Sequence, residues 1–92
     1  MSEELLNQLI ALAKQFHLTK LVQFGSSLES FDDCRDVDFA CDGLNDKSFF
    51  SFGADLEKLF NKQIDLIPLD PTDKFSEYIL KNGRLIYVSD AN

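Results

Sequence analysis

The sequence predicts an α+β domain in which helices pack on a small mixed sheet of about four strands. Three observations lead to this fold class. Stretches with helical spacing of apolar residues alternate with short strand-like runs. Two of the strand-like runs are joined by a short polar turn, which makes the sheet at least partly antiparallel. The 92 residues, 45% of them apolar, suit a single domain spanning residues 1–92 with one core.

The first helix is expected from residue 2 to about residue 17. Leu5, Leu9 and Leu12 lie on one stripe at helical spacing, which is typical of a helix with one face against a core. Ser2 is a good N-terminal cap, and the two glutamates after it favour the positive end of the helix dipole. The segment therefore begins as a capped amphipathic helix.

Two short strands are expected next, with a turn between them. Residues 20–24 are mostly apolar and stop at Gly25. Residues 26–33 are polar, which indicates a turn or at most a short helix. Residues 36–41 alternate with a period of two, so their apolar side chains face one side of the strand and two aspartates face the other.

The second half of the chain continues as helix, strand, helix, strand. Apolar residues at helical spacing predict a helix from about residue 48 to residue 60, and alternation predicts a strand over 63–67. A third helix starts after Pro71 and stops at Gly83, and residues 84–88 form the last strand. We expect the nine phenylalanines to lie in the core.

The charge of the chain argues against nucleic acid as a ligand. Sixteen acidic residues against nine Lys and Arg give a formal net charge of −7. A protein that tracks a phosphate backbone needs clustered cations, which this sequence lacks. The same acidity favours a bound cation or a basic protein partner.

Location and thiol chemistry can also be predicted. The sequence has no run of 18 apolar residues, so no membrane span is expected, and its acidic start differs from a secretory signal, which predicts a cytoplasmic protein. Two cysteines, Cys34 and Cys41, are too few for a four-thiolate zinc site or a disulfide framework. We expect both to be reduced thiols in or near the core.

Three aspartates form the candidate metal site. Asp36 and Asp38 are two residues apart on one strand, so their carboxylates leave the same face about 6.5–7 Å apart and repel each other unless a cation lies between them. Asp65 lies between apolar neighbours on a later strand and is expected on the same polar face. Mg²⁺ prefers such oxygen ligands, and three carboxylates can hold two metal ions.

The turn after the first strand is the candidate phosphate site. Gly25 lets backbone N–H groups approach a phosphate closely, and Ser26 adds a hydroxyl donor. The chain returns from this turn to Asp36 within a few residues, so we expect the turn and the aspartate pair to lie side by side.

Together these motifs resemble a known family. Phe24-Gly25-Ser26, followed after nine residues by Asp36-Val37-Asp38 and later by Ile64-Asp65-Leu66, is similar to the DNA polymerase β-type nucleotidyltransferase superfamily, in particular its minimal nucleotidyltransferase (MNT) branch. The resemblance covers essentially the whole chain and implies a nucleotidyltransferase fold. It implies that Gly25 and Ser26 hold nucleotide phosphates, that all three aspartates bind metal, and that Asp65 also activates the nucleophile.

The resemblance also implies an activity and a partner. MNT proteins use Mg²⁺, here two ions or Mn²⁺ in their place, and ATP or another nucleoside triphosphate. They are commonly paired with a helical HEPN protein as the antitoxin of a toxin–antitoxin module. The expected function is transfer of AMP to a hydroxyl on that partner. A catalytically weakened binding module that neutralises a partner, and a transferase acting on a small molecule, are the alternatives. The oligomeric state is open.

The turn departs from the family pattern at three places. Ser30 stands where a second Gly is common, and Ser27 and Glu29 occupy the stretch where an Arg is common. The residue before the first aspartate is Arg35, where the family often has Ser. We therefore expect weak affinity for free ATP, with Arg35 as the cation able to compensate.

Overall fold

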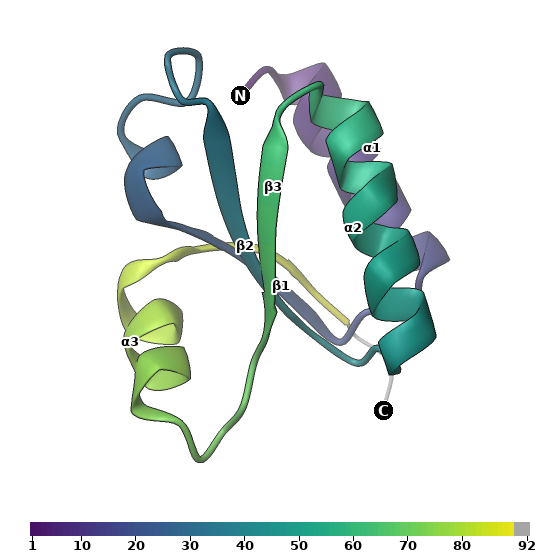
Figure 1. Ribbon diagram of the computed structural model, residues 1–92, viewed down its shortest axis with the longest axis vertical. Coiled ribbons are helices and arrows are strands. Elements are labelled where there is room, and N and C mark those ends of the chain that lie inside the picture. Colours follow the sequence, from purple (N-terminus) through teal and green to yellow (C-terminus); the bar gives the residue numbers. More distant parts are fainter. Residues whose placement is uncertain (90–92) are drawn as a thin grey trace.

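The computed structural model describes residues 1–89 and alternates helices with strands (Figure 1). Most element bounds agree with the sequence prediction, and the strands after the first helix and at the end of the chain agree to the residue. In chain order the elements are α1 (Glu3–Gln15), β1 (Lys20–Phe24), the short 3-10 helix η1 (Gly25–Leu28), β2 (Asp36–Asp42), α2 (Asp46–Phe60), β3 (Gln63–Pro68), α3 (Lys74–Asn82) and β4 (Arg84–Val88).

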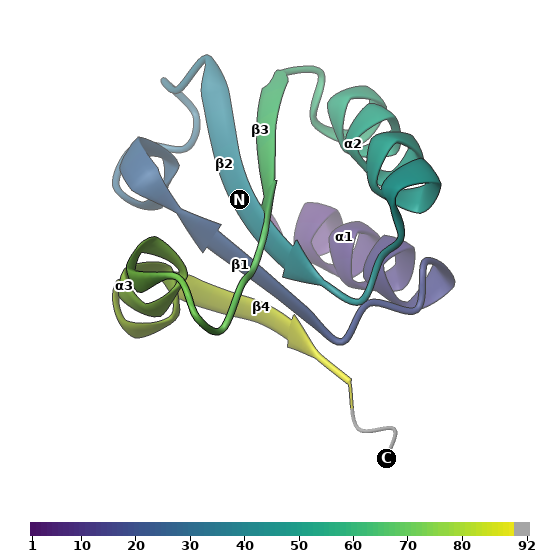
Figure 2. The same cartoon turned by 60° about the horizontal axis from the view of Figure 1, so that its bottom comes forward.

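The four strands form one mixed sheet in the order β3-β2-β1-β4 (Figure 2). β1 pairs antiparallel with both β2 and β4, as the short connection between β1 and β2 requires. β2 and β3 are parallel, because α2 carries the chain back along the sheet before β3 begins. The α+β fold class with a mixed four-stranded sheet is therefore confirmed.

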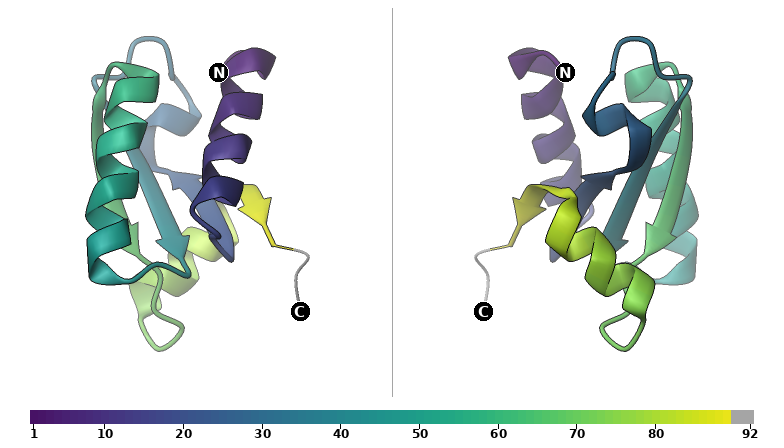
Figure 3. Two further views of the ribbon diagram at one scale, coloured as in Figure 1. Left: turned by 90° about the vertical axis from the view of Figure 1, so that its right-hand side faces the viewer. Right: turned by 90° about the vertical axis from the view of Figure 1, so that its left-hand side faces the viewer.

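Helices cover the two faces of the sheet unequally (Figure 3). α1 and α2 lie on one face and enclose the main core with the inward side chains of β1 and β2. α3 lies on the other face, where the buried cluster contains only Val22, Ala40 and Ile79. Part of that second face is left uncovered. Among residues 1–89, no helix combines the length and the apolar character needed to cross a membrane.

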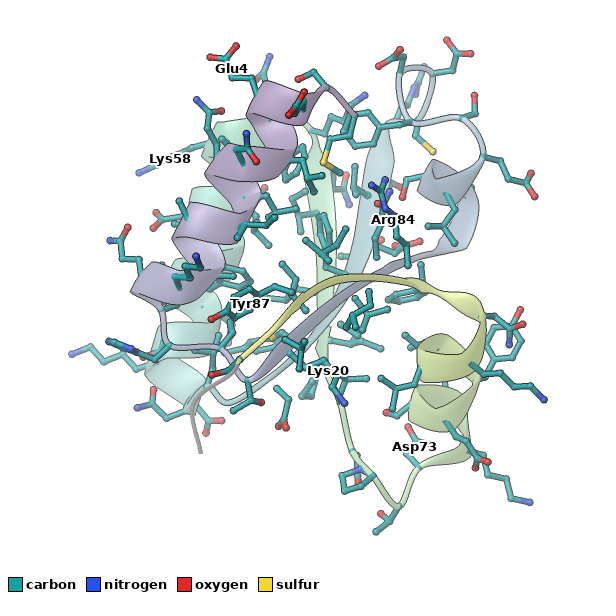
Figure 4. All side chains as sticks on the ribbon, turned by 180° about the vertical axis from the view of Figure 1, so that it is seen from behind. Glu4, Lys20, Lys58, Asp73, Arg84 and Tyr87 are labelled. Atoms are coloured by element: carbon teal, nitrogen blue, oxygen red, sulfur yellow. The ribbon has the colours of Figure 1, made fainter. Side chains whose placement is uncertain are left out.

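Each of the three α-helices begins at a polar cap. The Ser2 hydroxyl accepts a hydrogen bond from the Leu5 N–H at 3.1 Å, as predicted. Asn45 caps α2 in the same way, so this helix starts at Asp46, two residues before the predicted start at residue 48. Asp73 caps α3 and lies at its first turn (Figure 4). The prediction for α2 was late because it relied on the first apolar residue of the stripe instead of the cap.

The expectation that all nine phenylalanines are core residues was wrong for two of them. Phe50 is 77% exposed on the outer side of α2, and Phe75 is 51% exposed on α3. Phe75 still packs edge-on against Phe24, with ring centroids 5.9 Å apart. Phe24 in turn packs against the small cluster beneath α3, so Phe75 lies at the margin of that cluster.

Gly83 ends α3 for a reason that differs from the predicted one. Its φ of −81° is not left-handed, so no special backbone conformation requires glycine here. A Cβ at Gly83 would instead lie 2.7 Å from Val22 Cγ1 and 2.8 Å from the Gln23 carbonyl oxygen. The missing side chain therefore allows the end of α3 to contact β1 directly.

Candidate functional site

The register of β2 and β3 places Asp38 beside Asp65. These residues are direct partners in the parallel pair, so their side chains leave the sheet at the same level. Val37 and Phe39, on either side of Asp38, are fully buried in the main core on the other face. The aspartates therefore lie on the face that α3 covers only in part. Asp36 lies two residues earlier on the same face and is exposed.

The Asp38 carboxyl is the most perturbed of the three. Partial burial raises its pKa above the ordinary value. A hydrogen-bonding contact with Asp65 and the charge of Asp65 raise this pKa further, and the charge of Asp36 adds a smaller effect. Two carboxylates in contact repel each other when both are ionised, so a proton or a cation stabilises the pair.

The three carboxylates do not converge equally. Asp38 and Asp65 are in contact, whereas Asp36 acts on Asp38 only through its charge. Within residues 1–89, no three Asp, Glu, His or Cys side chains gather closely enough to hold a metal ion as they stand. The donor set still suits Mg²⁺, which takes one or two carboxylates and completes its octahedron with water and phosphate oxygens.

The Gly25 turn packs directly on Asp38, one member of this carboxylate pair. β1 ends at Phe24, which pairs with Asp38 across the sheet, and Gly25 then opens η1. Gly25 has a φ of +80°, in the region that favours glycine, and a Cβ built on it would overlap the Asp38 carboxylate. The turn and the aspartates thus share one surface, and only glycine allows this approach.

We expect Gly25→Ala to destabilise the fold by about 1–2 kcal/mol, because a left-handed residue with a Cβ costs that much before its clash with Asp38 is counted. Gly53→Ala is the matched control, since its Cβ would meet only Leu66 Cδ2 at 3.8 Å in the middle of α2. The control should be stabilised by up to about 1 kcal/mol. Urea denaturation of both variants measures the difference, and equal stabilities would contradict the tight approach at Gly25.

Two residues near the turn were not recognised from the sequence as part of the site. The Cys34 thiol lies 3.3 Å from the Ser26 hydroxyl, within hydrogen-bonding distance for sulfur. Lys62 donates a hydrogen bond to the Cys34 carbonyl oxygen at 2.6 Å. The sequence offers only position as a signal, since Cys34 comes two residues before Asp36 and Lys62 comes just before β3.

The two thiols differ in environment. Both are free, as predicted. Cys41 is buried in the main core, and burial, with a smaller contribution from Asp42, raises the pKa of its thiol to about 12. Cys34 is half-buried at the surface loop. Only Cys34 is therefore available to reagents from solvent.

A cavity of about 360 Å³ lies between η1 and the C-terminal half of α3. Glu29 lines it together with Gly25 and Ser26, so an acidic residue borders the turn. Arg35 is exposed and does not line it; its backbone carbonyl accepts a hydrogen bond from Gln63 N–H at 3.2 Å. The full lining is Phe24, Gly25, Ser26, Leu28, Glu29, Tyr78, Ile79, Asn82 and Gly83.

Similarity to known proteins is visible in structure alone. No protein-family model matches the chain, and no curated protein sequence does. Solved structures of MNT proteins do match. One is a tri-AMPylated Shewanella oneidensis HEPN toxin in complex with its MNT antitoxin, at 18% identity and a TM-score of 0.72, over 97% of this chain and 74% of the other.

Two further toxin–antitoxin structures agree with this match. One is an MntA–HpeT complex with two Asp-to-Glu substitutions, at 15% identity and a TM-score of 0.75. The other is a toxin–antitoxin with AMP-PNP, at 18% identity and a TM-score of 0.70. Both matches cover 92% of this chain and 74% of the other. At these identities the comparisons establish the fold, and the fold that the sequence motifs implied is confirmed.

Proposed function

We propose that this chain, which has the fold of the minimal nucleotidyltransferases, is itself a metal-dependent nucleotidyltransferase that transfers AMP from ATP to a hydroxyl on a partner protein. One observation carries the proposal. Asp38 and Asp65 are partners on neighbouring strands and Asp38 lies directly against Gly25, so the acidic residues and the candidate phosphate-binding turn share one surface. One of the structural matches contains AMP-PNP, which is consistent with a nucleotide at such a surface.

In the proposed reaction, each residue has a defined part. Backbone N–H groups at Gly25 and the Ser26 hydroxyl would hold the β- and γ-phosphates. Asp36, Asp38 and Asp65 would hold Mg²⁺, two ions or Mn²⁺ in their place, which when bound neutralises charge on the α-phosphate and the leaving group. Asp65 would accept the proton of the attacking hydroxyl, whose oxygen bonds to the α-phosphorus while pyrophosphate leaves.

The proposed partner is a helical HEPN-type protein. The matched structures are toxin–antitoxin complexes, and one of them contains a HEPN toxin that carries AMP groups. The net charge of −7 suits a basic partner surface and disfavours nucleic acid. In this role the chain would be the antitoxin, and the partner would supply the acceptor hydroxyl.

Mass spectrometry of the partner tests the proposal directly. The protein encoded beside this chain's gene, if it is all-helical, is incubated with the chain, ATP and Mg²⁺. We expect its mass to rise by whole AMP units, and the gain to require both ATP and the metal ion. Absence of any gain while the two proteins bind tightly would refute the transferase.

That outcome would support the second candidate, a weakened MNT-fold module that neutralises its partner by binding. A specific observation favours this candidate. Glu29 lines the cavity next to Gly25 and Ser26, and no Lys or Arg is among the described residues of the lining. A negative side chain within about 8 Å of a triphosphate weakens its binding.

Glu29→Arg is therefore expected to tighten Mg·ATP binding by about three- to tenfold, with the gain shrinking as salt is raised. Asp32→Arg is the matched control, because it makes the same charge change in the exposed loop and Asp32 does not line the cavity. Calorimetric titration of Mg·ATP at two salt concentrations measures the affinity of both variants. Equal effects of the two variants would mean that Glu29 acts only through net charge and not at the site.

A further inference from the structure

Lys62 connects the start of β3 to the loop of residues 29–35. Its ammonium group donates a hydrogen bond to the Cys34 carbonyl oxygen at 2.6 Å and lies 5.4 Å from the centre of the Phe31 ring. The side chain is half-buried between these partners. Hydrogen bonds from a charged donor are about twice as strong as neutral ones, and a cation over an aromatic face adds to this. Lys62 therefore holds the loop at two points.

The loop matters because of what lies at its two ends. It begins where η1 ends and leads directly into Asp36 at the start of β2. Inside the loop, Cys34 contacts the Ser26 hydroxyl at 3.3 Å, so the carbonyl group and the thiol of one residue face Lys62 and the turn respectively. Movement of Cys34 would displace Ser26 and the first residues of β2 together.

The loop has other contacts besides those with Lys62. The Phe31 ring packs edge-on against Phe60, with centroids 5.7 Å apart. The Arg35 carbonyl accepts a backbone hydrogen bond from Gln63 at 3.2 Å. Asp32 and Asp33, at the tip, are exposed, and Asp33 accepts only a hydrogen bond from the Ser30 hydroxyl. The contact from Lys62 is thus a short, charged side-chain hydrogen bond to the loop, close to where the loop leads into β2.

We propose that Lys62 is a positioning residue that sets the Ser26 hydroxyl and the Asp36 end of β2 for nucleotide binding, without contacting the nucleotide itself. The inference rests on the proposed nucleotidyltransferase function. Removal of Lys62 is expected to loosen the phosphate site and the Asp36 end of β2 while leaving Asp38, Asp65 and the core in place.

The experiment compares Lys62→Met with Lys62→Arg and Lys58→Met. Methionine keeps the apolar stem and removes the donor, whereas arginine keeps the charge and a donor. Lys58 projects from α2 into solvent and controls for the loss of one positive charge (Figure 4). Two readouts are used: the rate at which iodoacetamide labels Cys34, with buried Cys41 as the internal reference, and the Kd of Mg·ATP.

For Lys62→Met we expect labelling of Cys34 to accelerate about five- to tenfold with Cys41 still protected, and the Kd of Mg·ATP to rise by a similar factor. In the transfer assay KM should rise while kcat stays within about twofold, as for loss of a contact made equally in the ground and transition states. Lys62→Arg should restore most of the parent's labelling rate and Kd, and Lys58→Met should match the parent in both.

An unchanged labelling rate in Lys62→Met would overturn the inference, because the loop would then be held without Lys62. Faster labelling with an unchanged Kd would overturn it as well, because the loop would not be coupled to the phosphate site. A parent chain that binds no Mg·ATP would remove the proposed function and this inference together, a result distinct from the two before it.

Discussion

Replacing Asp65 by Asn is expected to lower the rate of AMP transfer by about a thousandfold, with a change of less than about threefold in the Kd of Mg·ATP. An amide has nearly the same shape as a carboxylate but cannot accept the proton of the attacking hydroxyl and is a poorer ligand for a hard cation. The phosphates are held at the Gly25 turn in the proposed mechanism, on the β1 side of Asp38, whereas Asp65 lies on the β3 side.

Single-turnover transfer, followed by mass spectrometry of the partner, separates chemistry from nucleotide binding. Glu57→Gln is the matched control, because Glu57 is an exposed acid on α2 and the change removes the same charge. It should transfer AMP at the parent rate. If Asp65→Asn also stays within a few-fold of the parent, Asp65 is only a surface carboxylate that happens to contact Asp38.

The double replacement Asp36→Asn, Asp38→Asn is expected to abolish the rise in melting temperature that Mg²⁺ or Mn²⁺ produces in the parent. A cation present at a hundred times its Kd stabilises the folded chain by about 2.7 kcal/mol, which corresponds to about 10–20 °C in a domain of this size. The double variant loses two of the three proposed ligands, and Asp65 alone should not hold the cation, so no such rise is expected. Asp32→Asn, Asp33→Asn changes the net charge equally and should keep the full response.

Without metal, the same double variant should be more stable than the parent at neutral pH. The pKa of Asp38 is raised in the folded chain, so the folded state binds more protons than the unfolded state as the pH rises above about 4. The stability of the parent therefore falls with pH over that window, and the variant avoids this loss. Urea denaturation of the parent and of the double variant at pH 4 and pH 7, without metal, measures this difference in stability. A gain in stability that is equal at both pH values would contradict the role of Asp38 ionisation.

The sequence by itself determined the elements and the polar face. Alternation around Val37 and Phe39 predicted that Asp36 and Asp38 share one side of a strand, and the structure has this arrangement. Periods of two and of 3.6 are properties of neighbouring residues, so they can be read without knowing the rest of the fold. The glycine at position 25 was likewise read as a turn residue from its place after a strand.

Only the tertiary structure decided which of these groups meet. The parallel register that sets Asp38 beside Asp65, the contact of Lys62 with Cys34 and the cavity between η1 and α3 each join residues from separate elements. The exposure of Phe50 likewise depended on which side of α2 faces the core, where Phe52 and Leu56 are buried. Such contacts follow from how strands align and helices pack, and local periodicity carries no information about register or about the partner that a side chain finds.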